Sequence, residues 1–167
     1  MDNPIKYTRE DVWNFLSEIP DPEIPVITIA ELGVLRKVEI VNTEVIVTIT
    51  PTYSGCPAMK TFEDDIKSTL IKNNISDFNV LTVHSPAWTT DWMTEEAREK
   101  LKQFGIAPPI KGTADKGILF SSDQKKINCP LCNSQNTSLK SQFGSTACKA
   151  LYSCNDCLEP FDYFKCI

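Results

Sequence analysis

Five of the seven cysteines carry the chemistry that this sequence could perform, and four of them form two pairs. The pairs are Cys129-Pro-Leu-Cys132 and Cys154-Asn-Asp-Cys157, with two residues inside each pair and 21 residues between them. Two tight turns of this kind point four thiolates at one tetrahedral zinc ion. The spacing therefore predicts a closed, structural metal site. A rubredoxin-like iron site uses the same turns, and a redox dithiol needs only one pair, so these alternatives stay open.

The fifth cysteine, Cys56, stands in the run Thr52-Tyr-Ser-Gly-Cys56-Pro57, where Pro57 favours the start of a helix. Helix N-termini carry unpaired N–H groups and a positive partial charge, and both lower the pKa of a thiol. The position predicts a thiolate that holds a soft metal or a cluster iron for a time. The alternative is a buried cysteine that ends a helix. His84 is the only histidine, so a Cys–His hydrolase is disfavoured.

Two carboxylates precede this segment in the run Pro20-Asp-Pro-Glu-Ile-Pro25. The three prolines hold the backbone extended and make the loop rigid. Asp21 and Glu23 would join Cys56 if this loop folds back over the helix start. A solvated acidic turn is the alternative, and the residues alone do not decide between the two.

The remaining pattern predicts an α+β fold, with a small three-stranded mixed sheet, helices on one side of it, and a C-terminal zinc ribbon. Helical spacing marks residues 8–19, 57–72 and about 94–104, and period-two alternation marks strands at 32–41, 44–51 and 78–83. We expect an α+β domain at 1–105, an irregular linker at 106–127 and the ribbon at 128–167. The ribbon is too small for its own apolar core, so its metal should contribute about 10–16 kcal/mol to folding.

Composition limits the function. The net charge is −5 and Lys and Arg are not clustered, which argues against nucleic-acid binding and favours a protein partner. No run of eighteen apolar residues is present, so no membrane span is expected. The polar start of the sequence lacks a secretory pattern, which predicts a cytoplasmic protein. In a reducing cytosol, paired cysteines are more often metal ligands than disulfides.

Four further residues each allow two interpretations. Cys148 and Cys166 fit small buried apolar residues, with an alternative ligand or a second thiol pair as the other interpretation. Trp88 and Trp92 fit core packing, with a binding surface as the alternative.

Several runs together resemble a known family. Asp21-Pro-Glu-Ile-Pro25 and Thr50-Pro-Thr-Tyr-Ser-Gly-Cys56-Pro57 are similar to the SufT-type metal–sulfur cluster assembly domain. Three later runs resemble the family of D subunits of bacterial phenylacetyl-CoA epoxidases, which are also called J subunits of phenylacetate-CoA oxygenase. They are Pro86-Ala-Trp-Thr-Thr-Asp-Trp92, the run 143–152 and the run 159–166. The resemblance covers nearly the whole chain.

The resemblance implies an accessory protein of phenylacetate degradation that helps to assemble iron–sulfur or iron centres in other epoxidase subunits. The iron–sulfur flavoprotein reductase is the expected client, and no catalysis by this chain itself is expected. Matching positions implicate Asp21, Glu23, Thr52 and Cys56 in transient binding of a metal or cluster. The aromatic residues Phe161, Tyr163 and Phe164 are expected to dock the client. The alternative is a non-catalytic structural subunit of the complex, and homodimerisation is left open.

Overall fold

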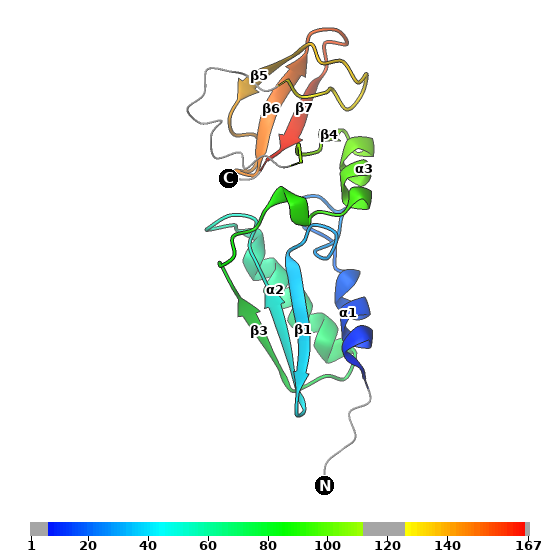
Figure 1. Ribbon diagram of the computed structural model, residues 1–167, viewed down its shortest axis with the longest axis vertical. Helices are drawn as coiled ribbons and strands as arrows, with labels where there is room; N and C mark the ends of the chain where they lie inside the picture. Colours follow the sequence, from blue (N-terminus) through cyan, green and yellow to red (C-terminus); the bar gives the residue numbers. More distant parts are fainter. Residues whose placement is uncertain (1–6, 112–125, 166–167) are drawn as a thin grey trace. The chain divides into compact units, whose positions relative to one another are not determined.

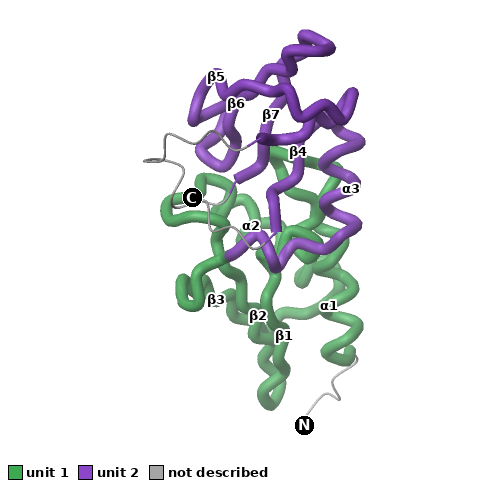
Figure 2. Tube along the Cα trace, turned by 45° about the horizontal axis from the view of Figure 1, so that its top comes forward, with its two compact units in different colours: residues 1–88 green, residues 89–167 purple. Residues whose placement is uncertain are grey.

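A computed structural model describes residues 7–111 and 126–165, and Cys166 lies outside them. The chain divides into two compact units, residues 1–88 and 89–167, which Figure 2 shows in different colours. The boundaries predicted at 105 and 128 remain a prediction, and each unit is described here by itself.

The first unit is built on a three-stranded mixed sheet (Figure 1). Strands β1 (Leu35–Val41) and β2 (Glu44–Ile49) pair antiparallel, and β3 (Phe78–Thr82) pairs parallel with β2. The β1–β2 turn places Asn42 at φ 57°, a left-handed conformation that asparagine tolerates well. The predicted hairpin and mixed sheet are therefore confirmed.

Two helices accompany this sheet. Helix α1 (Arg9–Ser17) begins at a capping box in which the Thr8 hydroxyl and the Asp11 carboxylate each bond the other residue's backbone N–H. Helix α2 (Ala58–Lys72) makes the crossover that a parallel β2–β3 pair requires. Both helices and one face of β2 contribute side chains to the buried core of the unit, namely Val12, Leu16, Val45, Val47, Ile49, Phe62, Ile66 and Leu70.

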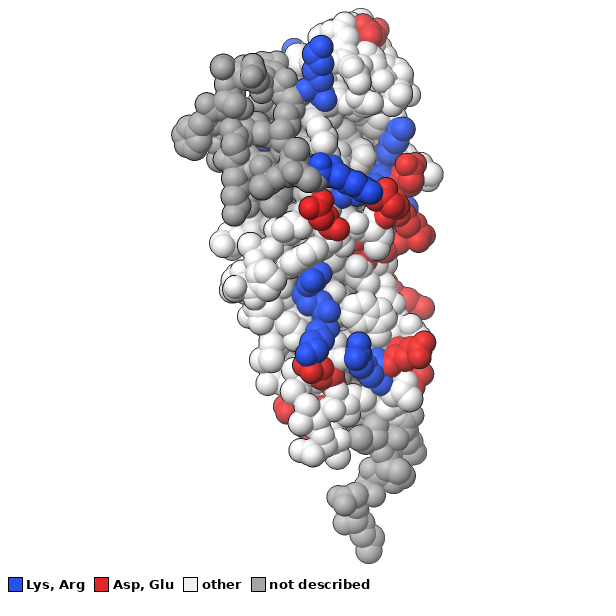
Figure 3. Space-filling view, in the orientation of Figure 1, with Lys and Arg blue, Asp and Glu red and all other residues white. Residues whose placement is uncertain are grey.

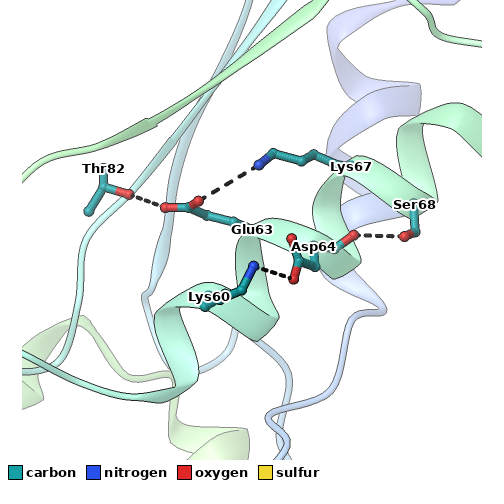
Figure 4. Close-up of polar contacts among 6 residues, drawn as sticks. All are labelled: Lys60, Glu63, Asp64, Lys67, Ser68 and Thr82. Carbon is teal, nitrogen blue, oxygen red and sulfur yellow. Dashed lines mark hydrogen bonds and ion pairs between the residues drawn. The ribbon is translucent and has the colours of Figure 1, made fainter.

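Polar contacts hold α2 in place along the sheet (Figure 4). The Thr82 hydroxyl at the end of β3 donates to Glu63 of α2 at 3.1 Å, and Lys67 lies 3.8 Å from the same carboxylate. Lys60 pairs with Asp64 one turn away at 3.1 Å. Exposed pairs of this kind contribute little energy each, and the Thr82–Glu63 bond links α2 to the end of β3.

The second unit contains the ribbon. Strands β5 (Thr137–Ser141), β6 (Lys149–Cys154) and β7 (Pro160–Phe164) form antiparallel neighbours, which confirms the predicted ribbon strands. A fourth strand, β4 (Ile106–Ala107), pairs parallel with β7, so the sheet order is β4-β7-β6-β5. The expectation of irregular structure was wrong at Ile106–Ala107. Two residues are too few to show a strand pattern in the sequence. They form a strand because they pair with β7, which is distant in the chain.

A short 3-10 helix η1 (Thr90–Trp92) and helix α3 (Glu95–Gln103) precede β4 in the second unit. Arg98 of α3 is buried and connects these pieces. Its two terminal nitrogens each donate at 2.5 Å, to the carbonyls of Thr90 and Pro109. The side chain thereby joins η1, α3 and the segment that follows β4.

Two further findings concern membrane-spanning helices and the distribution of charged side chains. Within residues 7–111 and 126–165, no helix is long and apolar enough to cross a membrane. On the face shown in Figure 3, the described basic and acidic side chains are interspersed, without a continuous basic patch.

Candidate metal sites

The four paired cysteines meet at one end of the ribbon. Their sulfurs all lie within 4.8 Å of one another, with Cys129 and Cys157 at 3.7 Å and Cys132 and Cys154 at 3.5 Å. Tetrahedral ligands about 2.3 Å from a zinc ion lie about 3.8 Å apart, whereas a disulfide needs about 2.05 Å. The geometry therefore fits a four-cysteine metal site such as a zinc site, in which all four positions are filled by protein.

The two cysteine turns, or knuckles, have the same backbone design. In each knuckle the first cysteine donates its N–H at 2.9 Å to the carbonyl five residues later, Cys129 to Ser134 and Cys154 to Glu159. The residue after the second cysteine has positive φ in both, 62° at Asn133 and 67° at Leu158. Because both segments have the same backbone geometry, their four sulfurs converge on one possible metal position.

Backbone N–H groups also point at the sulfurs. Those of Ser134 and Glu159 face Cys132 and Cys157, two residues before them in the chain. Such donors orient metal ligands and stabilise their charge. These two residues were missed in the sequence analysis. Each lies two positions after the second cysteine of its pair, and this shared spacing could have identified them.

The thiols of Cys154 and Cys157 have very different pKa values. The N–H groups of Cys157 and Asp156 outweigh desolvation and lower the pKa of Cys154 to about 7. The N–H of Glu159 favours the Cys157 thiolate, but desolvation and the neighbouring sulfurs prevail and raise its pKa to about 12. Only a bound cation can stabilise four adjacent thiolates, so metal binding must displace protons.

The second candidate site lies at the start of α2 in the first unit. The sulfur of Cys56 accepts from the N–H of Ala58 and bonds the side chain of Thr52, and it lies within the electrostatic reach of Glu23 and Asp21. Two chain segments thus bring all four predicted residues together. The proline-rich loop does fold back over the helix start, and the alternative of a merely solvated turn does not describe Asp21, which is 7% exposed.

Asp21 organises this loop. Its Oδ1 accepts from the N–H groups of Glu23 at 2.7 Å and Ile24 at 2.8 Å, and its own N–H donates to the carbonyl of Ile27 at 2.9 Å. Carboxylates favour such turns because they replace backbone acceptors. The turn keeps Glu23 within electrostatic reach of the thiol.

The expectation of a lowered pKa at Cys56 was wrong. Desolvation of the half-buried thiol raises the pKa most, and Glu23 and Asp21 raise it further. The N–H of Ala58 and the side chain of Thr52 lower it, as the helix-start argument requires, but they do not compensate. The free thiol is therefore neutral at pH 7.

Other candidates from the sequence have simpler roles. Trp88 is buried in the first unit and its indole N–H donates to the carbonyl of Leu32 at 3.0 Å, which confirms core packing. His84 is exposed. Cys148 is buried, and its sulfur lies 3.1 Å from the hydroxyl of Thr146 rather than at the four-cysteine site.

The aromatic docking surface expected on the ribbon was wrong. Phe161, Tyr163 and Phe164 are all buried in the second unit. Tyr152 packs against Phe161 and Tyr163, with both pairs of ring centroids 5.8 Å apart. A ribbon of this size needs its aromatic side chains as a core.

Comparison with known families assigns each unit a class. The iron–sulfur cluster assembly protein family matches residues 9–84, and the PaaD zinc beta ribbon domain matches residues 114–165. The fold and the two cysteine sites thus define an iron–sulfur cluster assembly domain followed by a zinc ribbon. A protein of Escherichia coli (strain K12), named as the putative D subunit of 1,2-phenylacetyl-CoA epoxidase, is 47% identical over 94% of this chain and 92% of its own length. The chain belongs to this family of phenylacetyl-CoA epoxidase D subunits.

More distant relatives cover the assembly domain. An "Fe-S protein maturation auxiliary factor" of Porphyromonas gingivalis is 31% identical over 103 residues, which are 60% of this chain and 97% of that protein. A crystal structure of a domain of unknown function from Bacillus anthracis has a TM-score of 0.52 at 27% identity, covering 56% of this chain and 90% of that one. A conserved hypothetical protein from Thermotoga maritima has a TM-score of 0.50 at 29% identity, covering 59% and 98%.

Proposed function

We propose that this chain is a non-catalytic maturation protein of the phenylacetyl-CoA epoxidase system, which assists assembly of iron–sulfur or iron centres in partner subunits. The observation that carries the proposal is the convergence of Cys56, Thr52, Asp21 and Glu23 at the start of α2. This site lies within the segment that matches iron–sulfur cluster assembly proteins, and one relative is named as an Fe–S protein maturation factor.

The chemistry of the site suits transient binding of iron as cargo. A thiolate is a soft ligand and carboxylates are hard ligands, so the set accepts an iron ion or the exposed iron of a cluster. The same negative charges that raise the pKa of Cys56 attract a cation, and the cation would displace the thiol proton. A single thiolate also releases its cargo more readily than four do.

The ribbon has a different task in this proposal. Its four sulfurs fill a tetrahedron, so a zinc ion there has no open position for cargo or catalysis. We assign it the stabilisation of the second unit and the contact with the partner subunit. Measured metal content should be one zinc per chain.

The decisive experiment replaces Cys56 with serine in cells that also produce the iron–sulfur flavoprotein reductase. We expect the cluster content of the purified reductase to fall several-fold, with zinc content and thermal stability of the variant unchanged. Cys148→Ser is the matched control, because Cys148 belongs to neither of the two sites. Full cluster occupancy with the Cys56 variant would leave the alternative, a structural subunit without metal chemistry.

A further inference from the structure

Two leucines are exposed at the metal end of the ribbon. Leu131 lies inside the first cysteine pair and is 61% exposed, and Leu158 follows the second pair directly and is 78% exposed. We call these two residues the knuckle leucines. Leu158 is the most exposed large apolar side chain among the described residues. Water contact of this extent gives the folded chain no stability.

The backbone at Leu158 strengthens this observation. Its φ of 67° lies in the left-handed region, where residues other than glycine, asparagine and aspartate are strained. The equivalent residue of the first knuckle is Asn133, at φ 62°, which shows that the design works with a residue suited to it. Leucine at 158 is thus unfavourable in both exposure and conformation, and a strained outlier of this kind points to function.

The charges beside Leu158 in the chain are negative. Asp156 and Glu159 are exposed and flank Leu158 in the chain. The Asp156 carboxylate accepts from the Asn136 amide at 2.7 Å and from the Ser134 hydroxyl at 2.5 Å. Four thiolates around one Zn²⁺ leave a further net charge of about −2. Cations lie at the first knuckle instead, where Lys102 and Lys126 line a hollow together with Cys129 and Pro130.

We propose that the knuckle leucines insert into an apolar socket with a basic rim on a partner subunit of the epoxidase. A basic rim complements Asp156 and Glu159, whereas a second copy of this chain, which carries a net charge of −5, or an anionic membrane would bring like charges together. An exposed aliphatic pair with a charged border is the expected form of an interface anchor. The inference rests on the proposed function and replaces the buried aromatic residues as the docking surface.

The test measures binding of the zinc-loaded full chain to the purified iron–sulfur flavoprotein reductase, and then to each other epoxidase subunit, by biolayer interferometry. Leu158→Asn copies the first knuckle, so the variant should retain zinc and unfold at the same or a higher temperature. We expect its Kd for the partner to rise about tenfold or more, and Leu131→Asn to act in the same direction. Affinity should also fall as salt rises.

Ile71→Asn is the matched control, because Ile71 is 63% exposed on α2 and far in sequence from the ribbon. An unchanged Kd for Leu158→Asn, an equal loss for Ile71→Asn, or no binding to any epoxidase subunit overturns the proposal. Cys56→Ser should bind normally in the same assay. Docking and maturation can therefore fail separately, since one is measured by Kd and the other by cluster content of the client.

Discussion

Asp21 allows its structural and its electrostatic roles to be separated by two substitutions. Both N–H groups that it accepts bond the same atom, Oδ1. An asparagine in its place would keep an oxygen at that position, whereas an alanine would leave two amides of a buried turn without an acceptor. Hydrogen bonds to a charged group contribute about 1.5–3 kcal/mol each, and neutral ones about 0.5–1.5 kcal/mol. We expect Asp21→Ala to cost about 3 kcal/mol or more, and Asp21→Asn about half as much.

Urea unfolding followed by tryptophan fluorescence measures this difference in the zinc-loaded full chain. Hydrogen exchange of the Glu23 and Ile24 amides gives a local readout, because these two amides should exchange much faster in the alanine variant than in the asparagine variant. Asp65→Ala is the control, since the Asp65 carboxylate makes no side-chain hydrogen bond or ion pair within the part of the chain that the structure describes. Equal midpoints for the two Asp21 variants would refute the assignment of the turn to Oδ1.

Three further predictions follow from the two sites and from α3. Because burial and carboxylate repulsion raise the pKa of Cys56, its alkylation by iodoacetamide should require a higher pH than that of a cysteine in an unstructured peptide, and Glu23→Gln should shift the profile to lower pH. A profile at or below that of the peptide cysteine contradicts the structure. Cys129→Ser, or removal of zinc by a chelator, should abolish the near-UV circular dichroism of the ribbon, since the metal contributes about 10–16 kcal/mol to folding, while far-UV signal from the first unit persists. Arg98→Met should lower the free energy of unfolding by about 2–4 kcal/mol, because it leaves the carbonyls of Thr90 and Pro109 without their donor. Arg98→Lys should not restore this stability, because a single ammonium group cannot replace the two terminal nitrogens of the guanidinium group.

The sequence predicted those features that depend on neighbouring residues. The helix expected within residues 8–19, the neighbouring strands expected within 32–41 and 44–51, and the two cysteine knuckles all depend on local patterns, and each is present. The metal site could be predicted because the spacing inside a knuckle fixes the backbone so narrowly.

Features that depend on tertiary packing could not be predicted in the same way. The helix start does lower the pKa of Cys56 through the N–H of Ala58, but burial and two carboxylates from a distant loop reverse the outcome. In β7, Phe161 and Tyr163 alternate as surface or core residues would, and only the small size of the ribbon explains why they are core. The strand Ile106–Ala107 exists only through its pairing with β7.

The raised pKa of Cys56 bears directly on how the proposed cargo site would be controlled. A thiol that is neutral at pH 7 does not react freely with oxidants or alkylating agents, because the thiolate is the nucleophile. A cation placed between this thiol and the carboxylates of Asp21 and Glu23 reverses the electrostatics, since the repulsion that disfavours the thiolate becomes attraction to the metal. Binding of iron would then release a proton, and a fall in pH would promote its release. The same arrangement therefore protects the empty site and makes its occupation reversible, which is what a protein that passes iron to another subunit requires.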